Sequence, residues 1–249
     1  MKGAVTATAD QARALDDAAG QVGVSSDALM AIASFQCARL AQSLLDDLPG
    51  EASVAVLAGR GNNGGDALGC ARHLAAWGRR VRAVALGDLA DPEAGYSRQT
   101  RAAQAAGVEL PPANYSAESA IEWALAGAGL IVDGLLGTGS SGPVRGTVAE
   151  AVHRINTSAA LVLAIDVPSG LDATTGEASG DCVRADVTLM LAVPKSGCLA
   201  PCAHTLVGRL WLADIGVPAA AYREAGLRPP HLSGNSLEPF EAVVARESS

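Results

Sequence analysis

The sequence has few aromatic residues, no excess of positive charge and no long apolar run. Phe, Trp and Tyr make up 3% of the 249 residues, although 49% are hydrophobic. The core must therefore consist mainly of Ala, Val, Leu and Ile, as is typical of alanine-rich helices covering a sheet rich in Val and Leu. A net charge of −8 argues against nonspecific binding to nucleic acids or anionic membranes, because neutralising their phosphates needs a basic surface.

Membrane and export signals are missing too. No apolar run approaches the roughly 20 residues of a spanning helix. Residues 1–10 lack the basic and apolar regions of a signal peptide. The sequence therefore predicts no membrane partner.

Cysteine is scarce as well. The five cysteines are scattered and odd in number, and only Cys198 and Cys202 lie close together in the sequence. No second pair and no histidines accompany them at ligand spacing, so we expect neither a zinc site nor a disulfide framework. Unpaired thiols are typical of a reducing compartment, and we expect a cytoplasmic protein.

Two helices, at 9–20 and 27–48, open the chain, and strands then alternate with helices. The expected strands are 53–58, 81–86, 108–110, 130–132, 160–165, 187–192 and 209–213, and the expected helices among them are 66–77, 92–106, 117–126 and 146–155. This alternation predicts an α/β fold, a Rossmann-like three-layer αβα sandwich with a mostly parallel central sheet. We expect a single domain over 1–229 and an irregular tail over 230–249.

Polar side chains gather at three predicted strand ends, where doubly wound sheets bind their ligands. The clusters are Asn62, Asn63 and Asp66 among Gly59, Gly61, Gly64 and Gly65; Asp133 followed by Gly137, Thr138, Gly139, Ser140, Ser141, Gly142 and Pro143; and Asp166 followed by Pro168, Ser169, Gly170, Leu171 and Asp172. Each cluster alone could merely stabilise a turn or cap a helix. Together they predict one pocket with at least three carboxylates and two amides.

The first cluster is not an ordinary nucleotide-binding loop. Gly59, Gly61 and Gly64 fit the spacing of a dinucleotide fingerprint, but no strand-end acid follows about 20 residues later to bind a ribose. Gly64, Gly65 and Asp66 stand where a P-loop would need Gly-Lys-Ser/Thr, so the Walker lysine is missing. A hydride-transferring dehydrogenase and a P-loop kinase are both disfavoured.

These motifs resemble the NAD(P)H-hydrate epimerase family, also called the YjeF N-terminal domain. The resemblance covers about residues 5–218 and is to the stand-alone form of the family. It rests on ordered motifs at 62–66, 132–139, 142–146 and 165–172, with further matches at 27–30, 185–188, 194–195 and 213–218. The resemblance implies the fold already expected from the alternation of strands and helices.

The resemblance also implies an isomerase that repairs nicotinamide cofactors. Reduced NAD or NADP that is hydrated at the nicotinamide ring exists as R and S epimers, which the family interconverts. A dehydratase that uses ADP or ATP then restores the cofactor from the S form. About 30 residues follow the last family motif, so the dehydratase is expected to be a separate partner protein. A homodimer formed through the opening helices is a further expectation.

Individual roles follow from the same resemblance. Asn63, Asp133 and Ser169 match residues that surround a potassium ion in the family. The hydrated cofactor is expected to contact Asn62, Asn63, Gly64, Gly65, Asp66, Gly137, Thr138, Gly139, Ser140, Ser141, Gly142, Pro143 and Asp166. Asp166 is the candidate catalytic acid/base, because desolvation can raise a carboxyl pKa toward the working pH.

No lysine is assigned to catalysis. Gly87 stands where some family members carry a lysine with a suspected catalytic part, and Lys195 is equally compatible with facing solvent or contacting a phosphate. The alternative function is a non-catalytic scaffold or binding module of the same fold. Retention of Asn63, Asp133, Asp166 and Ser169 favours the enzyme, because a scaffold need not keep all four. No residue indicates a preference between the NAD and NADP forms.

Overall fold

The computed structural model of the chain describes residues 6–86, 95–233 and 236–247. Within these residues one seven-stranded sheet has the order β2-β1-β3-β4-β5-β6-β7, and all neighbours are parallel except β6 and β7. The strands are β1 (Ser53–Ala58), β2 (Val81–Ala85), β3 (Ala128–Gly134), β4 (Leu161–Ile165), β5 (Val187–Leu191), β6 (Arg209–Ala213) and β7 (Leu237–Pro239). The predicted α/β fold with a mostly parallel sheet is confirmed.

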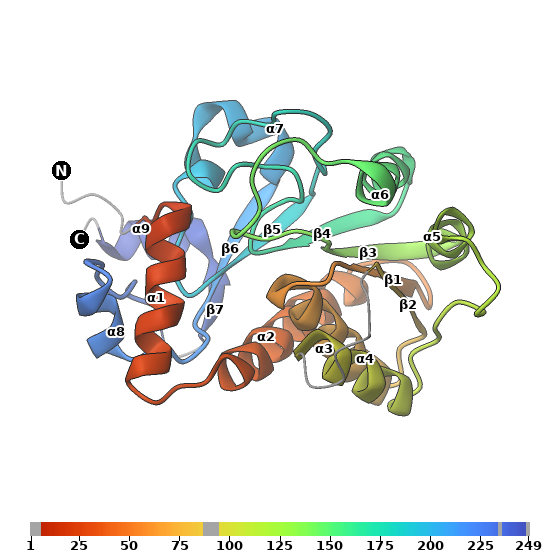
Figure 1. Cartoon of the computed structure of the whole chain (residues 1–249), viewed down its shortest axis with the longest axis horizontal. Helices are drawn as coiled ribbons and strands as arrows, with labels where there is room; N and C mark the ends of the chain where they lie inside the picture. Colours follow the sequence, from red (N-terminus) through yellow and green to blue (C-terminus); the bar gives the residue numbers. More distant parts are fainter. Residues whose placement is uncertain (1–5, 87–94, 234–235, 248–249) are drawn as a thin grey trace.

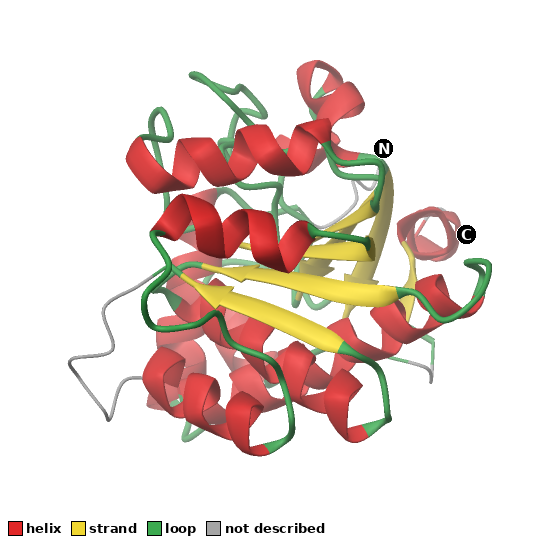
Figure 2. Ribbon diagram, turned by 90° about the vertical axis from the view of Figure 1, so that its right-hand side faces the viewer, coloured by secondary structure: helices red, strands yellow, loops and turns green. Residues whose placement is uncertain are grey.

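Helices cover both faces of the sheet, which gives the three layers seen edge-on in Figure 2. One layer holds α2, α3 and α4 packed side by side, and the opposite layer holds α5 and α6 (Figure 1). The helices are α1 (Ala9–Gln21), α2 (Ser26–Asp46), α3 (Asn62–Ala76), α4 (Gly95–Ala105), α5 (Ala117–Leu125), α6 (Gly146–Thr157), α7 (His204–Val207), α8 (Ala219–Glu224) and α9 (Phe240–Glu247). The first helix, α1, packs against α8 near the other end of the sheet.

The central strands are buried on both sides and consist almost entirely of small and branched apolar residues, as parallel strands between two helical layers require. The helix α2 is long and apolar enough to cross a membrane by length and composition alone, but 61% of its most apolar window is buried inside the protein. Its apolar side packs on α3 and the sheet. In this structure α2 is therefore a core helix.

The structure differs from the predicted boundaries at several places: α2 ends at Asp46 rather than at 48, and β3 spans Ala128–Gly134 rather than 130–132. The expected strand 108–110 is reduced to a single bridge between Arg82 and Glu109. The helix α3 begins at Asn62 rather than at 66, because Gly61 is its extended N-cap residue and the glycine-rich segment forms the first helical turn. Glycine's low helix propensity hides that turn in the sequence. Gly87 and the expected helix start at 92–94 lie outside the described residues.

The expectation of an irregular tail is wrong for residues 237–247. The strand β7 pairs with β6 in antiparallel register, and α9 follows it directly. Phe240 and Val243 are buried against a small core cluster, and buried Glu238 accepts a hydrogen bond from the backbone N–H of Ser233. The Pro, Gly and Ser residues of the tail signal turns, but burial of Phe240 and Val243 provides enough apolar contact to order a strand and a helix after them.

The strand order places a topological switch point between β1 and β3. From β1 the chain passes through α3 to β2 on one side, and from β3 it passes through α6 on the opposite face to β4. The two strands end side by side, since Ala58 pairs with Gly134 and the N–H of Gly59 donates to the carbonyl of Gly134. A crevice outside the strand ends at such a point is where doubly wound folds bind ligands.

Candidate active site

A cavity of about 720 Å³ opens at this switch point. It brings together residues of all three predicted clusters with residues of α1 and of the segment after β5. Its polar and charged lining comprises Arg13, Asp16, Arg60, Asn62, Asn63, Asp66, Thr138, Ser140, Asp166 and Lys195, and Gly61, Gly137 and Gly139 supply backbone. The prediction that separate strand-end loops form one pocket is therefore correct.

Not every predicted contact residue lines this cavity. Ser141, Gly142 and Pro143 line an adjoining hollow of about 280 Å³, together with Arg145, and the two spaces share Gly137 and Ser140. Gly64 and Gly65 are buried within the first turn of α3 and line neither space. Asp133 and Ser169 are fully buried and also lie outside the cavity lining.

Two glycines allow the three backbone segments of the site to touch. A Cβ at Gly64 would lie 1.7 Å from the carbonyl oxygen of Gly59, and a Cβ at Gly59 would lie 1.8 Å from that of Leu135. Any larger residue would push α3 away from β1, or β1 away from the loop after β3. Glycine is thus required here for close approach, and it places the N-terminus of α3 at the cavity.

Asp166 ends β4 in the left-handed region, with φ 68°. One carboxylate oxygen forms an ion pair with Lys195, whose side chain is 4% exposed, and the other accepts hydrogen bonds from the hydroxyl and the N–H of Thr138. The ammonium group of Lys195 also donates to the carbonyl of Leu191 at 2.6 Å. A non-glycine residue at positive φ is costly, and such strain concentrates at functional sites.

The electrostatic surroundings reverse the expected direction of the Asp166 pKa. Burial opposes ionisation of this carboxyl, but Lys195 and the hydrogen bonds from Thr138 outweigh it and lower the pKa below the ordinary value. Asp166 is therefore a carboxylate at neutral pH. The sequence argument considered desolvation alone, which raises a carboxyl pKa. The sequence does not show that buried Lys195 forms an ion pair with Asp166.

Other acids of the site have raised pKa values. Burial raises the pKa of Asp66 well above its ordinary range, and the negative charges of Asp166 and Asp16 add to this effect. Burial likewise raises the pKa of Asp133 to about 6, against the stabilising hydrogen bonds from Ser169 and Leu135. The site therefore holds an ionised carboxylate beside carboxyl groups that retain protons more readily.

The three residues predicted to surround a cation belong to one hydrogen-bond network, in which Leu136 joins Asn63 to Ser169 and Asp133. The Ser169 hydroxyl donates to Asp133 Oδ1 at 2.6 Å, and the Ser169 N–H donates to Asp133 Oδ2 at 2.9 Å. Asn63 Nδ2 donates to the carbonyl of Leu136 at 2.8 Å, and the N–H of Leu136 donates to Ser169 Oγ at 2.9 Å. The loop after β3 thus links all three side chains.

One buried oxygen of this cluster lacks a hydrogen-bond donor among the described residues. Asn63 Oδ1 is buried and accepts no hydrogen bond from the part of the chain that the structure describes. A buried acceptor without a donor is costly, and a cation held by oxygen ligands would satisfy it. In the same described residues, no three His, Cys, Asp or Glu side chains gather as a metal site, so any cation here would rely on amide, carboxylate and hydroxyl oxygens.

Sequence reasoning missed Lys195 and Asp16 as members of the site. Lys195 is buried against Asp166, so the alternative that it faces solvent is wrong. Residue 7, just before α1, forms a parallel bridge with Lys195, and this contact brings α1 to the cavity. The match at 194–195 to a family motif was the one signal for Lys195, and no local pattern marked Asp16.

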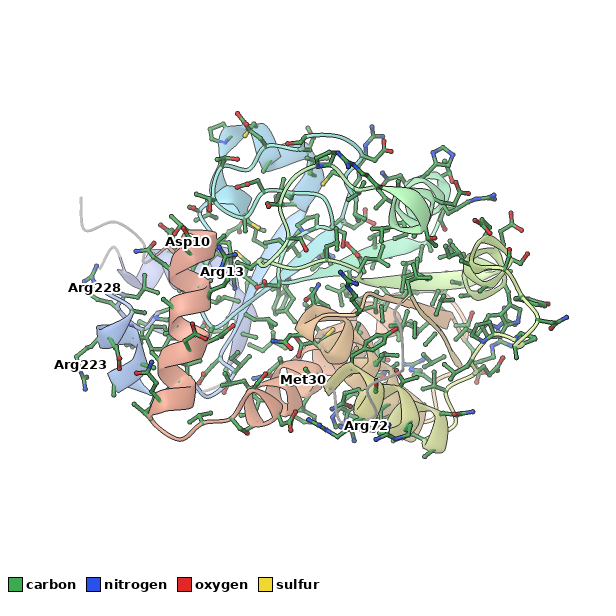
Figure 3. The ribbon with its side chains drawn as sticks, in the orientation of Figure 1. Asp10, Arg13, Met30, Arg72, Arg223 and Arg228 are labelled. Carbon is green, nitrogen blue, oxygen red and sulfur yellow. The ribbon has the colours of Figure 1, made fainter. Side chains whose placement is uncertain are left out.

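Of the three arginines Arg13, Arg145 and Arg72, two line the cavity or the adjoining hollow and one lines neither. Arg13 of α1 lines the cavity and donates to the carbonyl of Thr138 at 3.4 Å. Arg145, which borders the Gly142 and Pro143 loop, lines the adjoining hollow. Arg72 lines neither space; Figure 3 shows it among α3 and α4, away from α1 and Arg13.

Comparison with known proteins finds relatives that match most of the chain. The family model described as YjeF-related protein N-terminus matches residues 26–197. The NAD(P)H-hydrate epimerase of Rhodopirellula baltica is 37% identical over 186 residues, which are 75% of each chain. The NAD(P)H-hydrate epimerase of Limosilactobacillus fermentum is 35% identical over 83% of this chain and 95% of its own.

Two further matches extend the comparison. The bifunctional NAD(P)H-hydrate repair enzyme Nnr of Thermofilum pendens is 37% identical over 85% of this chain, which spans 40% of that longer protein. The crystal structure of yeast ynu0 shares the fold, with a TM-score of 0.77 at 21% identity over 95% of this chain and 99% of the yeast chain. This chain belongs to the NAD(P)H-hydrate epimerase family, the family of YjeF-related N-terminal domains.

Proposed function

We propose that this protein interconverts the R and S epimers of hydrated NADH and NADPH. The observation that carries the proposal is Asp166, held ionised by buried Lys195 and by Thr138 at the wall of the 720 Å³ cavity. Two relatives are named NAD(P)H-hydrate epimerase, and this chain covers 75% of the length of one and 95% of the length of the other. Because these relatives are named as epimerases, the alternative of a non-catalytic module is not favoured.

The cavity offers a place for the pyrophosphate of a dinucleotide and further space for the rest of the molecule. The N-terminus of α3 carries no side-chain cap, and its residues Gly61, Asn62 and Asn63 line the cavity. Unpaired N–H groups and the helix dipole favour a pyrophosphate there. The adjoining hollow with Arg145 extends the space for the remainder of the substrate.

The reacting centre is a carbon that carries a hydroxyl group and is bonded to the ring nitrogen. Its inversion requires a proton to be moved to and from that hydroxyl group, whether the hydroxyl leaves or the ring opens. Asp166 is the group we assign as base, because its pKa is low enough to keep the carboxylate ready to accept the proton. Lys195 and Thr138 position it.

A potassium ion is a further part of the proposal. Asn63 Oδ1, which lacks a donor among the described residues, the Asp133 carboxylate and Ser169 Oγ would hold it. When bound, the ion supplies positive charge next to the loops that contact the pyrophosphate. These residues also bind each other through the loop after β3, so the loop's position would depend on the ion.

The proposed biological setting is cofactor repair with a dehydratase. The relatives named bifunctional repair enzymes are more than twice as long as the matched region, since this chain spans 40% of one and 37% of another. We propose a separate ADP- or ATP-dependent NAD(P)H-hydrate dehydratase as functional partner, and the cytoplasm as location. The five cysteines are free thiols, which supports a reducing compartment. A homodimer is also proposed.

The proposal can be tested with purified R-hydrate and a dehydratase that accepts only the S form. Added protein is expected to accelerate recovery of NADH beyond the spontaneous rate of epimerisation. The control is the same mixture with Asp166→Asn protein. If NADH is recovered only at the spontaneous rate, both with and without potassium, the proposal is contradicted and the non-catalytic scaffold becomes the favoured function.

A further inference from the structure

We infer that Asp16, on α1, is a second proton-transfer residue of the site, and that it serves the face of the substrate ring opposite to Asp166. The inference rests on the proposed function and adds a catalytic residue to it. The alternative is that Asp16 is an ordinary surface acid of an exposed helix. Position, charge and the chemistry of inversion together favour the catalytic role.

Asp16 is accessible from the cavity and fixed in place. It lines both the main cavity and a small hollow of about 80 Å³ that it shares with Asp66. Its neighbour Leu15 is buried, and Thr8 forms a complete capping box at the start of α1. Figure 1 shows α1 lying next to α8, with which it packs.

The helix is also tied to the catalytic segment itself. The N–H of Ala7 donates to the carbonyl of Pro194 at 2.8 Å, and the N–H of Ser196 donates to the carbonyl of Ala7 at 2.9 Å. Lys195 lies between these two bonds. The backbone that positions Lys195 against Asp166 therefore also positions α1, and Asp16 and Asp166 line the same cavity.

The charges around Asp16 make it complementary to Asp166. Asp16 lies on the exposed side of α1, where it lines the cavity, and partial desolvation by the surrounding protein raises the pKa of its carboxyl to about 6. Lys195 opposes the rise, whereas Asp166 and Asp17 add to it. Asp66, Arg13 and Arg60 are the other charged groups of the same lining. One acid of the pair thus keeps its proton to higher pH than the other.

Inversion by departure and return of the hydroxyl needs such a pair. A carboxylic acid on one face gives its proton to the hydroxyl, the carbon–oxygen bond breaks, and water leaves while the ring-nitrogen lone pair forms a carbon–nitrogen double bond. Water then adds to the carbon from the other face and gives a proton to the carboxylate there, and the double-bond electrons return to nitrogen. One proton has moved between the two carboxyl groups, and atoms and charge balance.

The two directions of the reaction use the same total number of protons. Forward and reverse each start with one proton shared by Asp16 and Asp166, but on opposite members of the pair. The value of kcat/KM is therefore expected to fall as pH rises through about 6, where the shared proton is lost. A residue with only a structural role would not produce that limb of the profile.

The test compares Asp16→Asn and Asp17→Asn with the wild type, using the R-hydrate of NADH across pH 5 to 8. Asp17→Asn is the matched control, because it makes the same charge change one residue along α1. Asp16→Asn is expected to lower kcat about 100-fold or more with little change in KM, and to lose the limb near pH 6. Asp17→Asn is expected to keep the rate and the limb, with only a small shift of the limb to lower pH, because Asp17 is the smallest contributor to the raised pKa of Asp16.

Several results would overturn the inference. One is a wild-type rate in Asp16→Asn; a second is a loss confined to KM; a third is persistence of the limb near pH 6 in that variant. If thermal unfolding shows that Asp16→Asn does not fold, Asp16→Glu is measured in its place. This variant keeps a carboxyl group and is expected to keep the limb near pH 6. Loss of the limb in Asp16→Glu would also overturn the inference. Failure of the wild type to epimerise is a different result and contradicts the proposed function itself.

Discussion

Lys195 forms a buried ion pair with Asp166, although the two residues are supplied by segments that follow different strands, β5 and β4. The lysine side chain is 4% exposed and that of the aspartate 13%. Lys195 therefore determines which protonation state Asp166 adopts. The pair also connects the site to α1, because the backbone at Lys195 pairs with Ala7.

Removing the charge at Lys195 should change the pH dependence of activity. Asp166 has a lowered pKa with the lysine present, so Lys195→Met is expected to raise it, because only the hydrogen bonds from Thr138 then oppose the effect of burial. Because the base must be ionised, activity would be lost at a higher pH than in the wild type as the pH falls. A kcat/KM profile measures this, and an unchanged acid limb would show that Lys195 does not control Asp166.

The same substitution should reduce stability. Breaking a buried pair leaves an uncompensated charge, which typically costs about 3–5 kcal/mol. Urea unfolding at pH 7 measures the loss for Lys195→Met. The double variant Lys195→Met with Asp166→Asn removes both charges and is expected to regain most of that stability. Equal loss in the single and double variants would mean that the ion pair is not its cause.

Asp166→Asn should separate binding from chemistry. The amide keeps the shape of the side chain but cannot take the proton, so epimerisation is expected to fall by about 10²–10⁴-fold. Binding of NADPH, followed by calorimetry or fluorescence, should remain measurable because the phosphate contacts come from other loops. Full activity in this variant would remove Asp166 from the mechanism.

Gly64→Ala should be far more damaging than Gly61→Ala. The added Cβ at 64 would meet the carbonyl oxygen of Gly59 at 1.7 Å, whereas the one at 61 meets nothing within 4 Å. Overpacking of this kind costs about 1–3 kcal/mol or more. Thermal unfolding of the two variants measures the difference. Equal melting temperatures would show that the segments do not need this close approach.

Potassium should stabilise the protein through Asn63, Asp133 and Ser169. A ligand that binds only the folded state raises the melting temperature, by an amount that grows with the ratio of its concentration to its Kd. The pKa of Asp133 is raised to about 6, so protons compete with the cation below that pH. The stabilisation over an equal concentration of choline chloride should be larger at pH 7.5 than at pH 5. Asn63→Leu should lose it, and an equal effect of both salts would contradict the cation site.

Most of the site could be predicted because its residues follow strands directly. Asn62, Asp66, Thr138 and Asp166 line one cavity, as expected when the carboxyl ends of parallel strands share one edge of a sheet. Local patterns of glycine and polar residues are sufficient to find them. The order of the strands was not needed for this result.

The remaining features depend on tertiary contacts that no local pattern encodes. Lys195 and Asp16 reach the cavity through the bridge between residue 7 and the segment after β5. The first turn of α3 consists of residues with low helix propensity, so its start at Asn62 depends on packing against β1 and the loop after β3. The tail is ordered by burial of Phe240 and Val243.

The most direct test of the central claim is to separate the R and S epimers of hydrated NADH by chromatography after incubating pure R-hydrate with the protein. Wild-type protein is predicted to bring the mixture to its equilibrium ratio much faster than buffer alone, and Asp166→Asn to leave the spontaneous rate almost unchanged. Equal rates for buffer, wild type and variant would contradict the claim that this cavity epimerises the hydrated cofactor.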